Sequence, residues 1–108
     1  MMNKFVFGEI VLLKFPFTDG DKSKKRPALI LLDSNDGDIV VCRITSKLYN
    51  SDYDFRIENW EKVGLKLPSV IRLHKIATLD KLLIEQIIGI IDAELKMIVK
   101  SQFDRIIF

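Results

Sequence analysis

The chain has 108 residues, of which 48% are hydrophobic and 30% are charged, a composition typical of one globular domain with a well-supplied core. A single cysteine excludes an internal disulfide, and one cysteine with one histidine cannot build a Cys/His zinc site. The N-terminus lacks the pattern of a signal peptide, and no apolar run reaches the ~20 residues of a membrane helix. We therefore expect residues 1–108 to form one cytoplasmic domain.

The net charge of +2 is concentrated in one short segment. Residues 14–26 contain five Lys or Arg residues and two Asp residues, so their net charge of +3 exceeds that of the whole chain. A basic loop on a nearly neutral body is typical of phosphate binding, and a merely solvated loop is the alternative.

Runs rich in aliphatic and β-branched residues predict five or six short strands. They cover 8–15, 26–33, 38–46, 53–57, 69–76 and 84–91. The sequence SNDG at 34–37 predicts a hairpin turn, because Asn and Gly accept positive φ. Residues 78–81 are expected to form a tight or single-turn helical connection, and a buried helix remains an alternative for the last run.

The C-terminal region has the clearest helical pattern. Asp92 is a good N-cap, because its carboxylate accepts hydrogen bonds from the free N–H groups of the first turn. A mostly apolar stripe then recurs at helical spacing, formed by Leu95, Ile98, Val99, Gln102, Phe103 and Ile106. These elements predict a mainly β fold with a C-terminal helix, arranged as a small, strongly bent, mostly antiparallel barrel.

The signatures of several enzyme classes are missing from the sequence. It contains no glycine-rich phosphate loop, no Gly-x-Ser-x-Gly elbow and no calcium-loop spacing. We therefore expect a function that needs neither a cofactor nor a metal ion.

Cations and hydroxyl groups gather instead near the ends of the predicted strands, in KKRP at 24–27, ITS at 44–46 and SVIRLH at 69–74. Because alternate residues of a strand share a face, Arg72 and His74 project together, and Arg43 lies on one face with Thr45. Each residue also has a structural interpretation. Arg26 is then a solvated cation, Thr45 ends a strand, Arg72 forms an ion pair and His74 is simply exposed.

The order of these motifs resembles the MazF/PemK toxins of bacterial toxin–antitoxin pairs. The similar blocks are GEIVLLKFPFTDGDKSKKRPALIL at 8–31, IVVCRITS at 39–46 and LPSVIRLHKIATLDK at 67–81, followed by a short strand and a terminal helix. The resemblance covers nearly the whole chain. It implies the small SH3-like barrel that this family shares with the CcdB toxins.

The resemblance also implies a function: a metal-independent endoribonuclease toxin that cleaves single-stranded RNA (mRNA) at short sequences. Such toxins act as homodimers, and a cognate antitoxin blocks them with an extended acidic segment. The family's catalytic arginine, in the basic motif before a proline, matches Arg26, and its threonine matches Thr45 with Ser46 beside it. The arginine that PemK-like members use on a later strand matches Arg72.

One position departs from the family pattern. Where PemK-like members carry an aspartate that acts as a base, this chain has His74. An imidazole can also take or give a proton near neutral pH, so proton transfer stays possible while the identity of the base is open.

The implied reaction requires only what the chain can supply, because RNA carries its own nucleophile in the 2′-hydroxyl. Arg26 is expected to stabilise the phosphorane, Thr45 to bind the phosphate or orient the 2′-hydroxyl, and Arg72 to act as a second clamp. The products are a 2′,3′-cyclic phosphate and a 5′-hydroxyl. The side chains expected to hold the flanking RNA are Lys22, Lys24, Lys25, Ser46 and Ser69.

Two alternatives remain open at this point. One is a CcdB-like toxin that binds gyrase without nuclease activity, and the other is a non-catalytic SH3-like binding module. A homodimer is compatible with the large supply of phenylalanine, namely Phe5, Phe7, Phe15, Phe17 and Phe108, which exceeds what so small a barrel readily encloses.

Overall fold

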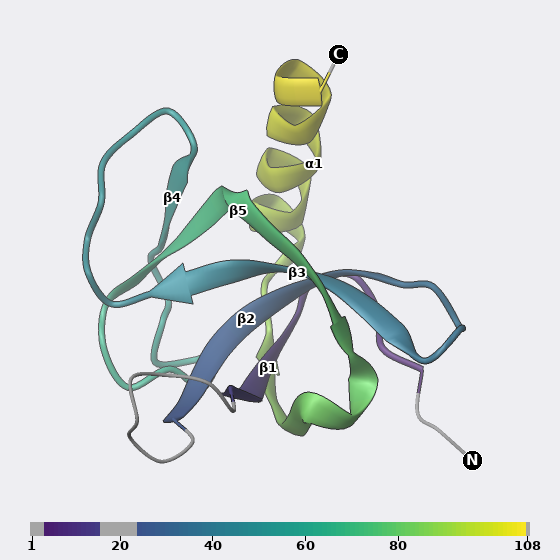
Figure 1. Cartoon of the computed structure of the whole chain (residues 1–108). Helices are drawn as coiled ribbons and strands as arrows, with labels where there is room; N and C mark the ends of the chain where they lie inside the picture. The colour runs from purple at the N-terminus through teal and green to yellow at the C-terminus, as the bar shows by residue number, and fades with distance from the viewer. Residues whose placement is uncertain (1–3, 16–23, 108) are drawn as a thin grey trace.

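Six antiparallel strands and one C-terminal helix make up most of the described part of the chain (Figure 1). The computed structural model describes residues 4–15 and 24–107, without the side chains of Phe15 and Lys24. The strands are β1 (Glu9–Phe15), β2 (Lys24–Asp33), β3 (Asp38–Thr45), β4 (Asp54–Ile57), β5 (Ser69–Asp80) and β6 (Ile84–Ile90). A 3₁₀ helix, η1 (Lys81–Leu83), joins β5 to β6, and α1 (Ala93–Ile107) ends the fold.

The mainly β, mostly antiparallel fold with a C-terminal helix is confirmed, and its sheet is not closed into a barrel. The strands form one sheet in the order β4-β5-β3-β2-β1-β6, so β4 and β6 are its two edges. Backbone atoms of Val63 lie where a Cβ on Gly89 of β6 would stand, and the Ile88 carbonyl oxygen lies where a Cβ on Gly64 would stand. The turn at 63–64 therefore packs against β6, where a closed barrel would have a paired strand.

The elements follow the predicted ones closely. Asn35 and Gly37 have the positive φ values, 65° and 95°, that the predicted hairpin turn requires. The main difference is β5, which continues to Asp80, so that the single helical turn begins at Lys81 instead of at residue 78. The Asp80 side chain then caps this turn by accepting a hydrogen bond from the Leu82 N–H at 2.8 Å.

Strand β5 is sharply bent, as Figure 1 shows. Its pairing with β3 sets Arg72 opposite Arg43 and Ile76 opposite Cys42, so residues 73–75 of β5 have no counterpart on β3. Extra residues on one strand of an antiparallel pair bend that strand and increase its twist. This bulge turns the second half of β5 over one face of the sheet.

The sheet buries apolar side chains on both faces. The first core contains Ile10, Leu29, Ile44, Leu73 and Val99, and α1 covers it. The second core contains Val11, Leu13, Ile30, Ile39 and Val41, and it is closed by side chains from the end of β5 and from η1 and β6. Each of the central strands therefore contributes to two cores through its alternating residues.

The predicted N-cap of α1 is confirmed, because Asp92 accepts a hydrogen bond from the Leu95 N–H at 2.9 Å. The apolar stripe is narrower than predicted. Val99 is fully buried, while Ile98 and Ile106 are 41% and 39% exposed. None of the helices within residues 4–15 and 24–107 has the length and apolar character that a membrane crossing needs.

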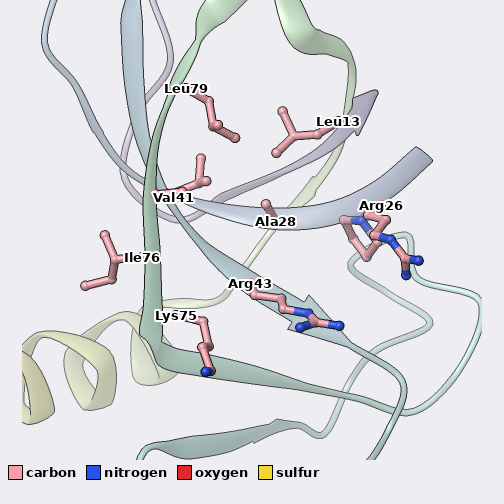
Figure 2. Close-up of a pocket in the computed structure, with 10 residues that line it drawn as sticks. Leu13, Arg26, Ala28, Val41, Arg43, Lys75, Ile76 and Leu79 are labelled. Atoms are coloured by element: carbon pink, nitrogen blue, oxygen red, sulfur yellow. The ribbon is translucent and has the colours of Figure 1, made fainter. Parts of the chain in front are cut away.

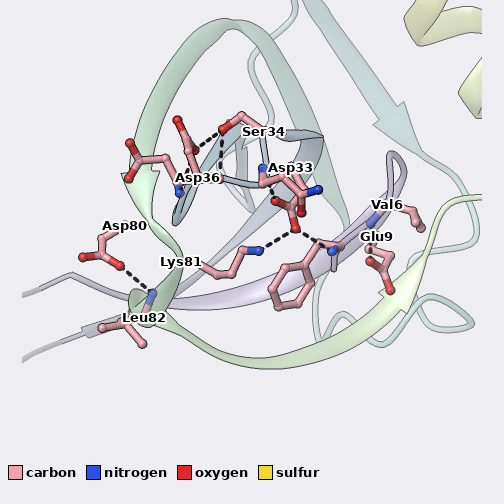
Figure 3. Close-up of polar contacts among 11 residues, drawn as sticks. Val6, Glu9, Asp33, Ser34, Asp36, Asp80, Lys81 and Leu82 are labelled. Carbon is pink, nitrogen blue, oxygen red and sulfur yellow. Dashed lines mark hydrogen bonds and ion pairs between the residues drawn. The ribbon is translucent and has the colours of Figure 1, made fainter. Parts of the chain in front are cut away.

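A buried ion pair fastens the N-terminal segment to the sheet (Figure 3). Asp33 at the end of β2 accepts hydrogen bonds from the Phe5 N–H and from Lys81 Nζ, both at 2.8 Å. These two bonds, that of Lys81 first, lower the pKa of Asp33 to about 2. Phe5 is thereby held in the second core, and Phe7 packs half-buried against the first. Phe17, Phe108 and the side chain of Phe15 lie outside the described structure.

Candidate functional site

A pocket of about 500 Å³ opens beside the first core, where β2 begins and β3 ends. The cations and hydroxyl groups that line it are Lys25, Arg26, Lys66, Thr45, Ser46 and Ser69. The segment from Gly64 to Leu67 forms another wall, and Gln86 and Ile88 of β6 also line the pocket. We call this space the hydroxyl pocket.

The strand alternation explains why Arg26 and Thr45 meet in the hydroxyl pocket. Ala28 pairs with Arg43, and the same register continued by two residues along each strand leads to Arg26 and Thr45. On β3, one face carries the first-core residues and the other carries Ile39, Val41, Arg43 and Thr45. On this second face Ile39 and Val41 are buried, whereas Arg43 and Thr45 lie at the surface. One face of the sheet thus changes from closed core to open site within a single strand.

The Thr45 hydroxyl is held in place and can still donate. Its Oγ1 accepts a hydrogen bond from the Lys47 N–H at 3.2 Å. Because the oxygen is the acceptor in that bond, the hydroxyl proton remains available to an anion in the pocket. Ser69 differs, since its hydroxyl donates to the Leu67 carbonyl at 2.9 Å and is nearly buried.

Two cations of the hydroxyl pocket, Lys25 and Arg26, differ in their partners. Lys25 forms an ion pair with Glu85 at 3.1 Å. Arg26 is exposed and has no carboxylate partner among the residues that the structure describes. A free guanidinium beside a donating hydroxyl suits an oxyanion such as a phosphate, because the planar fork binds two oxygens at once.

Arg72 does not line the hydroxyl pocket. It forms an ion pair, which is the structural interpretation that the sequence also allowed. Its Nε–H donates to Asp54 at 2.8 Å, and the Tyr49 ring covers the guanidinium at 3.5 Å. Asp54 also accepts hydrogen bonds from the N–H and hydroxyl of Ser51 at 2.9 and 2.6 Å. Burial of Asp54 raises its pKa, but the bonds from Arg72 and Ser51 outweigh it, and the pKa lies below its ordinary value.

His74 is exposed and also lies away from the hydroxyl pocket. Its ring packs against Tyr53, with 5.0 Å between the ring centroids. Of the predicted RNA-binding lysines, Lys25 lines the pocket, whereas Lys22 and the side chain of Lys24 lie outside the described residues.

Sequence reasoning missed two polar residues of the hydroxyl pocket, Lys66 and Gln86. Lys66 lies in an irregular segment, where the sequence has no periodicity that would indicate which side chains face the pocket. Gln86 lies on β6, where only the pairing of β6 with β1 reveals that it stands opposite Leu12, another lining residue. Among the described residues, no three His, Cys, Asp or Glu side chains converge as metal ligands do.

The one cysteine does not belong to the site. Cys42 is buried in the first core, on the face of β3 opposite to Thr45. Burial raises the pKa of its thiol to about 12. The thiol is therefore protonated at neutral pH and is a poor nucleophile.

Comparison with known proteins places this fold among toxins. Residues 7–107 match the family described as "PemK-like, MazF-like toxin of type II toxin-antitoxin system". No curated protein matches the sequence significantly.

Several solved structures share the fold at low sequence identity. The toxin MazF-mt6 of Mycobacterium tuberculosis is 19% identical, with a TM-score of 0.70 over 87% of this chain and 89% of that one. A chain of the MazE–MazF crystal structure from Deinococcus radiodurans is 18% identical, with a TM-score of 0.77 over 98% and 97%. An endoribonuclease from a mycobacterial species is 16% identical, with a TM-score of 0.69 over 93% and 86%. Because the family match spans almost the entire sequence, this chain belongs to the PemK-like, MazF-like toxins of type II toxin–antitoxin systems.

Proposed function

We propose that the chain is an endoribonuclease that cleaves single-stranded RNA, including mRNA, in the hydroxyl pocket without a metal ion. The observation that carries this proposal is that Arg26 and Thr45, from two different strands, line one pocket. Family membership supports it, and one structural neighbour is itself an endoribonuclease.

The proposed reaction is an internal transesterification. The 2′-hydroxyl of the RNA loses its proton and its oxygen attacks the adjacent phosphorus. A bond from that oxygen to phosphorus forms, the bond from phosphorus to the 5′-oxygen breaks, and the departing oxygen takes up a proton. The products are a 2′,3′-cyclic phosphate and a 5′-hydroxyl, and no water is consumed.

Arg26 and Thr45 act on the crowded phosphate in this proposal. The guanidinium stabilises the negative charge that grows on the non-bridging oxygens, and the Thr45 hydroxyl donates to the same group. Fixed donors of this kind need no reorganisation as the charge develops, and their removal typically costs about 10²–10³-fold in rate.

The residues around these two hold the rest of the RNA. Lys25, Ser46 and Ser69 line the hydroxyl pocket and are proposed to bind the neighbouring nucleotides, together with Lys22 and Lys24. Arg72 and His74 have the catalytic roles that the resemblance implies only if they reach the RNA from outside this pocket. A homodimer and a cognate antitoxin complete the proposal, and the second is supported by the MazE–MazF neighbour.

Cleavage of a long single-stranded RNA in excess EDTA tests the proposal. The wild-type protein should cut it and leave 2′,3′-cyclic phosphate ends. Arg26→Ala and Thr45→Val should each lower kcat/KM by about 10²-fold or more while the circular dichroism spectrum is retained. Arg56→Ala is the matched control, because Arg56 is an exposed strand arginine on β4 that does not line the pocket.

Two outcomes would contradict this assignment. RNA left intact by the wild-type protein would favour a gyrase-binding toxin or a binding module. Full activity of Arg26→Ala would remove Arg26 from the mechanism even if the RNA is cut.

A further inference from the structure

A second pocket adjoins the hydroxyl pocket, and none of the roles above uses it (Figure 2). Its volume is about 400 Å³. Aliphatic side chains form its walls, among them Leu13, Ala28, Val41 and Leu79. The charged side chains that line it are Arg26, Arg43 and Lys75. We call this space the apolar pocket.

The bulge in β5 creates the apolar pocket. Arg43 follows Val41 on the open face of β3, so it stands where the second core ends. Lys75 is the last of the three unpaired residues of β5, directly before Ile76 pairs again with Cys42. Figure 2 shows Arg43 and Lys75 on neighbouring strands at the rim, with Arg26 on the next strand.

The rim of the apolar pocket carries positive charge that no described carboxylate neutralises. Arg26, Arg43 and Lys75 are all exposed, and none has a carboxylate partner within residues 4–15 and 24–107. The rim is therefore suited to an anionic ligand whose other part is apolar.

The apolar pocket and the hydroxyl pocket share one wall, because Arg26 and Pro27 line both. A strand of RNA whose phosphate lies on Arg26 can therefore extend an adjacent nucleotide toward the apolar pocket. A nucleotide combines a flat, weakly polar ring with a phosphate, which matches aliphatic walls below a basic rim.

We propose that the apolar pocket binds the base of the nucleotide next to the cleaved phosphodiester, while Arg43 and Lys75 bind that nucleotide's phosphate or the edge of its base. This inference rests on the proposed function and names two residues, Arg43 and Lys75, that determine which RNA sites are cut.

The rim also selects among the bases. Guanidinium and ammonium groups donate hydrogen bonds and accept none. Uracil and guanine present carbonyl oxygens where cytosine and adenine present an amino group, and an arginine binds guanine through two acceptors. Uracil or guanine is therefore preferred at this position. A good bidentate contact of this kind discriminates by about 5- to 160-fold.

A mapping experiment tests this selection. The wild-type protein is incubated with a pool of random single-stranded RNA, and the base frequencies around the cuts are determined by sequencing. One position beside the cut should favour uracil or guanine. Oligonucleotides that differ only by uracil or cytosine there then give the ratio of the two kcat/KM values.

Three variants locate the selection in the apolar pocket. In Arg43→Met/Lys75→Met the ratio should fall toward one, while preferences at other positions persist. Ala77→Leu should act likewise by filling the pocket while all three cations remain, since Ala77 is an exposed lining residue. Arg56→Met should keep the wild-type ratio.

The failures of this inference and of the proposed function are distinguishable. Wild-type protein that leaves all RNA intact overturns the proposed function and the inference together. Wild-type cleavage with base preferences that the double variant and Ala77→Leu leave unchanged overturns only the inference. Sedimentation that shows a changed oligomeric state, or a calorimetric titration that shows weaker antitoxin binding, with base preferences unchanged, would assign the pocket to a protein contact and would also overturn it.

Discussion

Arg72 of β5 donates its Nε–H to Oδ1 of Asp54 on the paired strand β4 over 2.8 Å. The two side chains are only 12% and 1% exposed. Tyr49 covers the guanidinium from the segment that precedes β4. Asp54 and Tyr49 thus fix the Arg72 side chain from two sides. We therefore expect Arg72 to stabilise the segment from 47 to 53 and not to bind a phosphate of the RNA.

Removal of Asp54 should therefore destabilise the fold. Asp54→Ala leaves the enclosed guanidinium of Arg72 without its acceptor, and we expect the free energy of unfolding to fall by about 1.5–3 kcal/mol. Urea unfolding of the wild type, Asp54→Ala, Arg72→Met and the double variant gives the coupling energy between the two side chains. If Arg72→Met keeps full stability but loses RNA cleavage, Arg72 acts on the substrate and the structural role is wrong.

His74 is tested by the pH dependence of cleavage. Because the ring packs against Tyr53 and does not line the hydroxyl pocket, we expect His74→Asn to keep the shape of the pH profile of kcat/KM. A general acid or base gives one limb of that profile. If one limb disappears in His74→Asn, His74 transfers the proton, as its place in the family motif implies.

The ion pair between Asp33 and Lys81 should make stability depend on pH in acid. The hydrogen bond from Lys81, followed by that from the Phe5 N–H, lowers the pKa of Asp33 from 3.8 to about 2. The folded state then binds this proton less tightly than the unfolded state. The stabilisation is complete above about pH 4 and is lost as the pH falls toward 2.

Thermal unfolding between pH 2 and pH 7 measures this effect. Asp33→Asn should lower the Tm at pH 7 by several degrees, and the difference from the wild type should shrink as the pH approaches 2. Asp104→Asn, on the exposed side of α1, is the control and should follow the wild type. If the Tm difference between Asp33→Asn and the wild type is the same at every pH, the charge of Asp33 does not stabilise the fold.

Local chemistry made much of the fold predictable. The hairpin at 34–37 follows from Asn35 and Gly37, which accept positive φ, and the start of α1 follows from the capping carboxylate of Asp92. The meeting of Arg26 with Thr45 was predictable in part, because strand alternation and one register decide it.

Features that depend on pairing across distant segments were not predictable in this way. Asp54 and Arg72 are 18 residues apart, and no periodicity connects them. Arg43 and Lys75 share a rim only because three residues of β5 are unpaired. The periodicity of a sequence indicates which residues share one face of a strand, but it does not indicate where the strand bulges. It therefore predicts the faces of strands better than it predicts which residues of different strands form a site.

The ion pair of Lys25 with Glu85 should limit RNA binding by the hydroxyl pocket. The Lys25 side chain is 53% exposed, but the Glu85 carboxylate lies 3.1 Å from its ammonium group and competes with phosphate. Glu85→Gln removes the competing charge, so we expect tighter binding to a non-cleavable, 2′-deoxy oligonucleotide. Lys25→Gln should weaken binding and reduce the slope of log K against log salt by about 0.7, the contribution of one phosphate contact on a single strand. Fluorescence anisotropy at several salt concentrations measures both variants. Equal affinities for wild type and Glu85→Gln, with an unchanged slope in Lys25→Gln, would show that Lys25 contacts no phosphate.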